Sequence, residues 1–210
     1  MIKALRLLTI LIAACTVSAF LAGCSEPFEP GEVLVAAPLP LLEEDEIDID
    51  ALLAWAEASV RRMFPRAYYQ GMSYAAVSEH MLDQRGRYVF RFGQRIPRPF
   101  QRGFVSVSVI FHVESGLAII HYQDLTGRSP NMAQQRRPDG VQVREVVSIA
   151  HRYLSERGVA GCIATLTDLG DRWDVMCYRH GTDCNCVCDF EIVDGEIHEQ
   201  RETICRDGSS

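Results

Sequence analysis

The sequence lacks the short motifs that mark the commonest catalytic centres. It has no Gly-x-Ser-x-Gly turn, no His-Glu-x-x-His helix and no phosphate-binding glycine loop. The acidic pair Asp48 and Asp50 indicates the start of a helix rather than a glycosidase pair. The histidines are scattered, which favours solvated or hydrogen-bonded side chains: His80, His112, His121, His151, His180 and His198. We therefore expect no catalytic residues, no enzyme activity and no cofactor.

Positive charge and long apolar runs are also scarce. The formal net charge is -7 at pH 7, which makes nucleic acid a poor partner. After residue 23 no apolar run approaches the roughly 20 residues that a membrane-spanning helix needs. Hydrophobic residues still make up 48% of the chain, enough to build the core of one domain or two small ones.

Residues 1–23 have the anatomy of a secretory signal peptide. Lys3 and Arg6 form a basic start, and an apolar run then extends from Leu7 to Phe20. The following Leu21-Ala22-Gly23-Cys24 resembles the lipobox of bacterial lipoproteins. In that family the cysteine receives a diacylglyceryl group and becomes the acylated N-terminus. The resemblance predicts lipidation at Cys24.

The lipoprotein resemblance also predicts a location. Ser25 follows the lipidated cysteine and carries no inner-membrane retention signal of the aspartate type. We expect the periplasmic face of the outer membrane, or the cell membrane if the organism has only one. The alternatives are an ordinary signal peptide with an incidental cysteine, and processing at Cys15. Processing at Cys15 is disfavoured because the apolar run continues to Leu21.

Residues 24–46 are predicted to form an acidic, proline-rich tether. Four prolines and the run Glu43-Glu44-Asp45-Glu46 favour an extended spacer without fixed structure. The weaker alternative is that Val33-Leu34-Val35 adds an edge strand to the domain.

Residues 47–123 have the periodicity of a helix followed by strands. Apolar residues at helical spacing predict an amphipathic helix from about Asp50 to Phe64, ended by Pro65. The segment Met72 to Leu82 is ambiguous. Alternating residues predict strands that include Tyr88–Phe92, Val105–Val113 and Leu117–Tyr122.

The pattern then repeats. A polar linker over 124–140 leads to residues 141–205, where a helix from about Val141 to Arg157 precedes four strands, and 206–210 form a tail. Phe111-His112-Val113-Glu114-Ser115-Gly116 parallels Phe190-Glu191-Ile192-Val193-Asp194-Gly195. The predicted class is α+β, with two repeats of an amphipathic helix packed on three to four antiparallel strands.

Two stretches of the second repeat carry a family likeness: Arg172-Trp173-Asp174-Val175-Met176 and Phe190-Glu191-Ile192-Val193-Asp194-Gly195-Glu196-Ile197. With the preceding helix, they resemble the PepSY-like family, and more loosely β-lactamase-inhibitor-like and cystatin-like folds. The resemblance covers the second repeat better than the first. It implies a non-enzymatic extracytoplasmic module that binds or restrains peptidases or other proteins.

Six cysteines remain after removal of Cys15 and lipidation of Cys24, and all lie near the C-terminus: Cys162, Cys177, Cys184, Cys186, Cys188 and Cys205. An even number in an exported chain favours disulfides. Turns centred on Leu169-Gly170, Gly181-Thr182 and Asp194-Gly195 place all six on one apolar face. They set Cys162 opposite Cys177, Cys177 opposite Cys186 and Cys184 opposite Cys205. Cys184–Cys205 is the favoured bridge, and the other pairings stay open.

The alternative is a metal site made of His180, Cys184, Cys186 and Cys188, whose atoms suit zinc or copper(I). The spacing argues against it, because alternate residues of a strand project in parallel rather than converge. A redox-active role is less favoured still, since there is no Cys-x-x-Cys.

The sequence thus predicts an envelope lipoprotein that binds a protein or peptide without catalysis, with peptidase inhibition as one form of that role. Its partners are the membrane, through the lipid, and an unidentified envelope protein or peptide. Contact is expected on the open sheet face or at a hairpin loop over Arg95–Gln101. The alternatives are a thiol-rich metal-binding protein and an enzyme without a recognisable motif.

Overall fold

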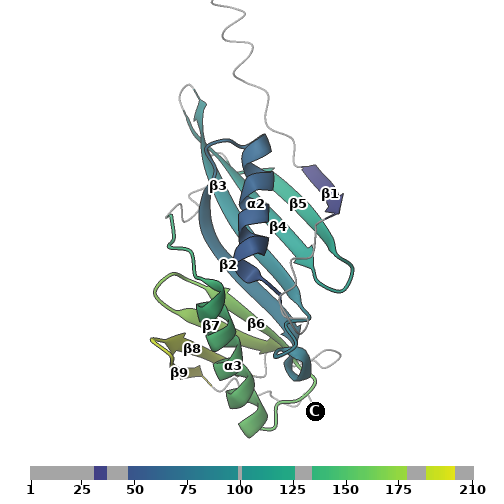
Figure 1. Cartoon of the computed structure of the whole chain (residues 1–210). Helices are drawn as coiled ribbons and strands as arrows, with labels where there is room; N and C mark the ends of the chain where they lie inside the picture. The colour runs from purple at the N-terminus through teal and green to yellow at the C-terminus, as the bar shows by residue number, and fades with distance from the viewer. Residues whose placement is uncertain (1–30, 37–46, 99–100, 126–133, 179–187, 202–210) are drawn as a thin grey trace, which may run out of the picture.

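The computed structural model describes residues 31–36, 47–98, 101–125, 134–178 and 188–201. Within these ranges, nine strands form one antiparallel sheet in the order β1-β5-β4-β3-β2-β6-β7-β8-β9, and α2 and α3 lie along the same face of it (Figure 1). The elements are β1 (Gly31–Ala36), α2 (Ile49–Met63), β2 (Tyr68–Val77), β3 (Arg87–Arg98), β4 (Gln101–His112), β5 (Leu117–Asp124), α3 (Gly140–Glu156), β6 (Ile163–Asp168), β7 (Trp173–Tyr178), β8 (Cys188–Val193) and β9 (Glu196–Arg201). No helix in the described ranges is long and apolar enough to cross a membrane.

The predicted class, α+β with two helix-plus-strand repeats, is wrong. Strands dominate the described residues, and a single sheet carries both helices, so the protein is closer to all-β. The sheet is continuous because β2 pairs with β6, for example through Ser73 opposite Thr167 and Ala75 opposite Thr165. This pairing satisfies two strand edges that separate units would expose.

Helix α2 begins and ends close to the predicted positions. The side chain of Asp48 caps it by accepting a hydrogen bond from the Ala51 amide at 2.9 Å. The helix ends at Met63, two residues before Pro65. Its apolar face is buried against the sheet through Leu52, Leu53, Ala56 and Val60.

Helix α3 has a capping box at its start. The Asp139 carboxylate accepts from the Gln142 amide at 2.8 Å, and the Gln142 side chain accepts from the Asp139 amide at 3.3 Å. After the helix, Gly158 takes a φ of +67°, the left-handed conformation that glycine adopts at little cost.

Part of the predicted tether is a strand. Residues Gly31–Ala36 pair with β5, with Val33 opposite Ile120 and Val35 opposite Ala118. The alternative of an edge strand is therefore confirmed for this segment. Cys24 and the signal peptide lie outside the described residues.

The structure resolves one ambiguous segment and differs from expectation in another. The ambiguous Met72–Leu82 belongs mainly to strand β2, followed by a short 3-10 helix over Ser78–His80. The Arg95–Gln101 segment is no long exposed loop, because β3 extends to Arg98 and pairs it with Gln101. Only residues 99–100 between the strands lie outside the described part.

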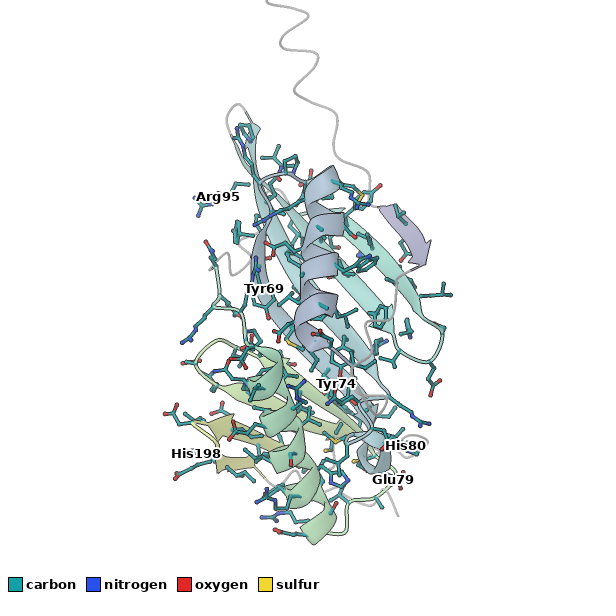
Figure 2. The ribbon with its side chains drawn as sticks, viewed as in Figure 1. Tyr69, Tyr74, Glu79, His80, Arg95 and His198 are labelled. Atoms are coloured by element: carbon teal, nitrogen blue, oxygen red, sulfur yellow. The ribbon has the colours of Figure 1, made fainter. Side chains whose placement is uncertain are left out.

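The core lies between the sheet and the two helices. Aromatic side chains dominate it beneath α2, where the Tyr74 and Tyr88 rings lie 4.8 Å apart and the Tyr69 and Phe92 rings 6.1 Å apart. Figure 2 shows Tyr69 and Tyr74 in this layer, and Arg95 and His198 at the periphery. The smaller residues Ala164, Leu166 and Val175 fill the part beneath α3.

Candidate functional site

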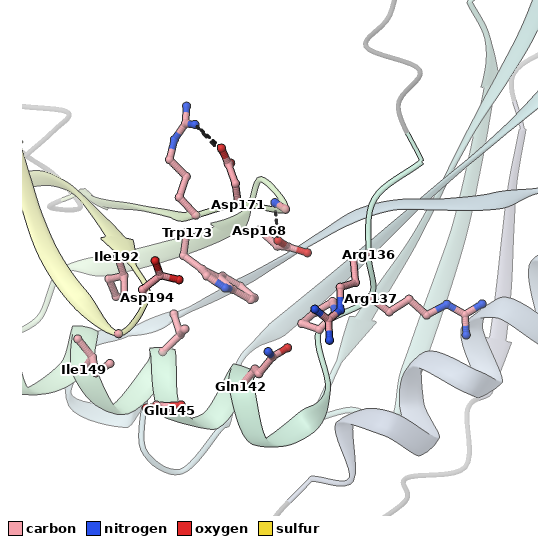
Figure 3. A pocket seen from close by; sticks show the side chains of 15 residues that line it. Arg136, Arg137, Gln142, Glu145, Ile149, Asp168, Asp171, Trp173, Ile192 and Asp194 are labelled. Atoms are coloured by element: carbon pink, nitrogen blue, oxygen red, sulfur yellow. Dashed lines mark hydrogen bonds and ion pairs between the residues drawn. The ribbon is translucent and has the colours of Figure 1, made fainter.

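A cleft of about 290 Å³ opens beside the first turns of α3 (Figure 3). Three segments far apart in sequence enclose it: residues 136–149, the β6–β7 turn and the β8–β9 turn. Trp173, Val146, Ile149 and Ile192 supply its apolar surface.

The rim of this cleft carries charges of both signs. Its cations are Arg136, Arg137 and Arg172, while Glu145, Asp171 and Asp194 supply carboxylates. Arg172 already forms an ion pair, since its Nε lies 2.9 Å from Glu191 Oε1. Charges of both signs around an indole suit a ligand that is itself partly apolar and partly charged.

Asp168 lies buried at the inner end of the cleft. It accepts hydrogen bonds from the Tyr69 hydroxyl at 3.1 Å and from the Gly170 amide at 2.8 Å. Burial raises its pKa, and the two hydrogen bonds partly oppose that shift. The same burial, together with the Asp168 charge, raises the pKa of Tyr69. Asp168 therefore holds the wall of the cleft to strand β2.

The segment that leads into α3 is fixed to the other helix. Arg137 forms an ion pair with the buried Glu57 of α2, which also pairs with Arg61 at 2.6 Å. The Gly140 amide donates to Asp50 of α2 at 3.0 Å. The Gly140 and Gln142 amides of the first turn of α3 are thus already bonded to carboxylates, which disfavours an anion site of the helix-terminus kind.

The other face of the sheet is not covered by either helix (Figure 1). One row of cross-strand partners on this face runs from β5 to β8, and its side chains change from apolar to acidic along the way. Its members are Ile119, Ile110, Val89, Ser73, Thr167, Asp174 and Glu191. At the acidic end, burial and then the charges of Asp189 and Glu191 raise the pKa of Asp174. This face is partly exposed along most of the row.

The cysteine registers differ from the prediction by two residues. Ala164, not Cys162, lies opposite Cys177, because a four-residue loop over 169–172 separates β6 from β7. Cys177 lies opposite Cys188, not Cys186. A shift of two keeps the face, so Cys162 and Cys177 are buried beneath α3 as expected. The Asp194-Gly195 turn is confirmed, with Val193 opposite Glu196.

Several predicted site residues lie outside the described part of the chain: Cys24, His180, Cys184, Cys186 and Cys205. The favoured Cys184–Cys205 bridge and most of the metal alternative therefore stay predictions. Cys162, Cys177 and Cys188 are thiols in the structure. Within the described ranges no group of three histidine, cysteine or acidic side chains is arranged to hold a metal ion. Figure 2 shows His80 and His198 far apart.

The sequence does not indicate this cleft. It singles out Trp173 only within the PepSY-like stretch, and Arg136 and Arg137 fall within the polar linker predicted over 124–140. The available signal was that polar turns rich in glycine and aspartate follow both β6 and β8. In an antiparallel sheet every second strand runs in the same direction, so β6 and β8 end at the same end of the sheet and their turns lie side by side there. Comparison with known proteins found no matching family model, curated protein or solved structure.

Proposed function

We propose that this chain is a membrane-anchored envelope lipoprotein that binds a protein or peptide without catalysis. The lipid would be carried by Cys24, in the lipobox-like Leu21–Cys24. The observation that carries the binding role is the cleft beside α3, where an indole and aliphatic side chains are surrounded by charges of both signs.

The size of the cleft favours a peptide side chain over a whole cofactor. Ligand pockets for small molecules and cofactors typically enclose about 300–1,000 Å³, and this cleft lies at the lower limit of that range. An aromatic or long aliphatic side chain of a partner would lie against Trp173. Backbone amides and carbonyls beside that anchor would meet Glu145, Asp194 and Arg136.

The position of the cleft also suits a protein partner. Its walls come from a helix and two turns at one edge of the sheet. Asp168 fixes the β6–β7 turn, and Glu57 fixes the segment before the helix. A site held this way loses little conformational entropy when a partner binds.

Fluorescence of Trp173 tests the proposal directly. The chain has two tryptophans, so Trp55→Phe leaves Trp173 as the only indole. A panel of synthetic peptides with aromatic, aliphatic or charged anchors would be titrated into this variant. We expect a saturable spectral shift with the apolar-anchor peptides. Absence of any shift across the panel would contradict the proposed site.

A matched pair of arginine variants separates the cleft from general charge effects. Arg136 lines the cleft, whereas Arg152 is exposed on α3 outside it. We expect Arg136→Ala to weaken binding of acidic-flanked peptides and Arg152→Ala to leave it unchanged. Equal losses in both variants would point to non-specific electrostatic attraction.

The lipid anchor has its own test. Radiolabelled palmitate should be incorporated into the wild-type chain and not into Cys24→Ala, which should also leave the membrane fraction. Labelling that survives Cys24→Ala would contradict the lipoprotein assignment.

A further inference from the structure

Three cysteines meet on the covered face of the sheet, beneath the C-terminal half of α3: Cys162 directly before β6, Cys177 in β7 and Cys188 in β8. Cys177 is central. On one side, Cys177 lies directly opposite Cys188 of β8. On the other side, Ala164 of β6 lies opposite Cys177, and Cys162 is two residues before Ala164. Hydrogen bonding links Cys177 to both neighbours.

The register distinguishes the two neighbours as disulfide partners. Directly opposed residues of antiparallel strands have Cα atoms about 4.5–5.5 Å apart, which lies within the range of disulfides. Cys162 is offset by two residues from the position opposite Cys177, and such diagonal pairs lie about 7–8 Å apart. Of these two neighbours, Cys188 therefore has the register that suits a disulfide bridge to Cys177.

The two thiols of the pair differ in solvent exposure, which indicates which one reacts first. Cys162 and Cys177 are each 0% exposed, while Cys188 is half-buried and within reach of solvent. A disulfide reagent that approaches from outside therefore meets Cys188 first.

A cation lies on the same side. The Tyr153 ring packs 4.4 Å from that of Phe190, two residues along β8 from Cys188, and the Arg157 guanidinium lies 4.5 Å above Tyr153. Hydrogen bonding from Cys177 is the main cause that lowers the pKa of Cys188. Burial and the charges of Cys162 and Asp189 oppose it, and the charge of Arg157 adds a smaller lowering effect. Hydrogen bonds with Cys162 and Cys188, and then burial, raise the pKa of Cys177. The accessible sulfur is thus also the one whose pKa is lowered, and a lowered pKa favours attack by a thiol.

We propose that Cys188 and Cys177 form a thiol–disulfide exchange site, with Cys188 as the attacking thiol, Cys177 as the resolving thiol, and Cys162 left as a buried thiol. The co-reactant is a disulfide, either of low molecular weight or on an oxidoreductase. The Cys188 thiolate attacks one sulfur of that disulfide and releases the other as a thiolate. Cys177 then loses its proton and attacks Cys188 Sγ, forming the Cys177–Cys188 bond and releasing the second thiolate. Two protein thiols are oxidised while one disulfide is reduced to two thiols.

The Cys177–Cys188 pair could not be found from the sequence motif that usually marks a redox-active cysteine pair. Cys-x-x-Cys motifs bring two sulfurs together within one turn of chain, whereas here two different strands supply them. The proposal does not depend on the binding cleft or on the lipid anchor.

Glutathione disulfide is the probe for the order of attack. The reduced full-length protein would be mixed with it and sampled over time by mass spectrometry. Trypsin cuts after Arg157, Arg172 and Arg179, so Cys162, Cys177 and Cys188 fall on three different peptides. Cys184→Ser, Cys186→Ser and Cys205→Ser, introduced together, make the assignment of Cys188 unambiguous.

The expected products are specific. Cys177→Ser should accumulate a glutathione adduct on Cys188, while Cys188→Ser should react at Cys177 about tenfold more slowly because that thiol is buried. With both cysteines present, the end product should be a Cys177–Cys188 cross-linked peptide, with Cys162 still alkylatable after denaturation. Cys162→Ser is the matched control and should give the same bridge.

Two results would overturn the proposal: a bridge that contains Cys162, or equal rates of adduct formation at Cys177 and Cys188. If a serine variant fails to fold, timed alkylation of the reduced protein that retains all three thiols gives the same answer. Cys188 should be labelled first, and labelling of Cys177 or Cys162 before it would contradict the assigned order.

Discussion

The hydroxyl of Tyr69 donates a hydrogen bond to Asp168 Oδ2 at 3.1 Å, across 99 residues of sequence. Tyr69 is 2% exposed and Asp168 is 5% exposed, so the bond is shielded from water. It joins the start of β2 to the end of β6, at the junction between the strands beneath α2 and those beneath α3. The cleft beside α3 depends on this bond, because Asp168 also fixes the β6–β7 turn through the Gly170 amide.

Removing the Tyr69 hydroxyl should destabilise the protein. Tyr69→Phe keeps the ring packed on Phe92 but leaves a buried carboxylate with one partner fewer. A buried acceptor that loses its partner typically costs about 1–3 kcal/mol. Urea unfolding of Tyr69→Phe should show a loss of that size. Tyr178→Phe, whose hydroxyl donates to the Met176 sulfur at 3.1 Å, serves as the control and should lose less. An unchanged unfolding free energy for Tyr69→Phe would mean that the bond contributes nothing net.

Asp168 should give stability a specific pH dependence. Burial raises its pKa in the folded state above the ordinary value of 3.8, so the folded protein holds this proton more tightly than the unfolded chain. The contribution is fully present below pH 3.8 and is lost as the pH rises through the raised pKa. Asp168→Asn cannot ionise and should flatten this part of the profile.

The measurement for Asp168 is the unfolding free energy between about pH 3.5 and pH 7. Asp171→Asn, on the exposed side of the same turn, is the matched control and should keep the wild-type slope. If Asp168→Asn also keeps the wild-type slope, another group causes the pH dependence of the unfolding free energy. Asp174, whose pKa is also raised, is then the next to test.

Asp50 should matter to both helices. It lies in the first turn of α2, and its carboxylate accepts from the Gly140 amide that begins α3. The positive ends of two helix dipoles meet there, and a carboxylate between them is favourable. Asp50→Ala should cost about 1–2 kcal/mol, by analogy with the loss of a helix cap. Asp83→Ala, at an exposed turn, should cost much less, and equal losses would show that the position of the charge is unimportant.

Glu57 is the buried charge that joins α2 to the segment before α3. Its side chain is 9% exposed and pairs with Arg61 and Arg137, which are themselves 54% and 46% exposed. Because both arginines are half in solvent, we expect Arg137→Ala to cost only about 1 kcal/mol. Glu57→Gln should cost about as much or more, since both pairs are lost.

A double-mutant cycle isolates the pair. The coupling between Glu57→Gln and Arg137→Ala should be favourable and should exceed that between Glu57→Gln and Arg152→Ala, which are not in contact. A coupling of zero for the first cycle would mean that Arg137 is positioned by something other than Glu57.

Local features were predictable from neighbouring residues. The helices begin at Asp48 and Asp139 and end near Pro65 and Gly158, because caps and breakers act within a few residues. The Asp194-Gly195 turn sets the β8–β9 register for the same reason. The predicted β6–β7 register was wrong by two residues, since Leu169-Gly170-Asp171-Arg172 allows either a four-residue loop or a two-residue turn at Leu169-Gly170.

The sequence by itself determined the helices, the alternating faces of the strands and the burial of Cys162 and Cys177, because these depend on periodicity and short-range hydrogen bonds. Only the tertiary structure decided that β2 pairs with β6, which turns two expected repeats into one sheet. It also decided that Trp173 lies beside α3 and that Cys177 lies opposite Cys188. These outcomes depend on which strand edges meet across long stretches of chain, where many pairings share the same alternation of apolar and polar residues.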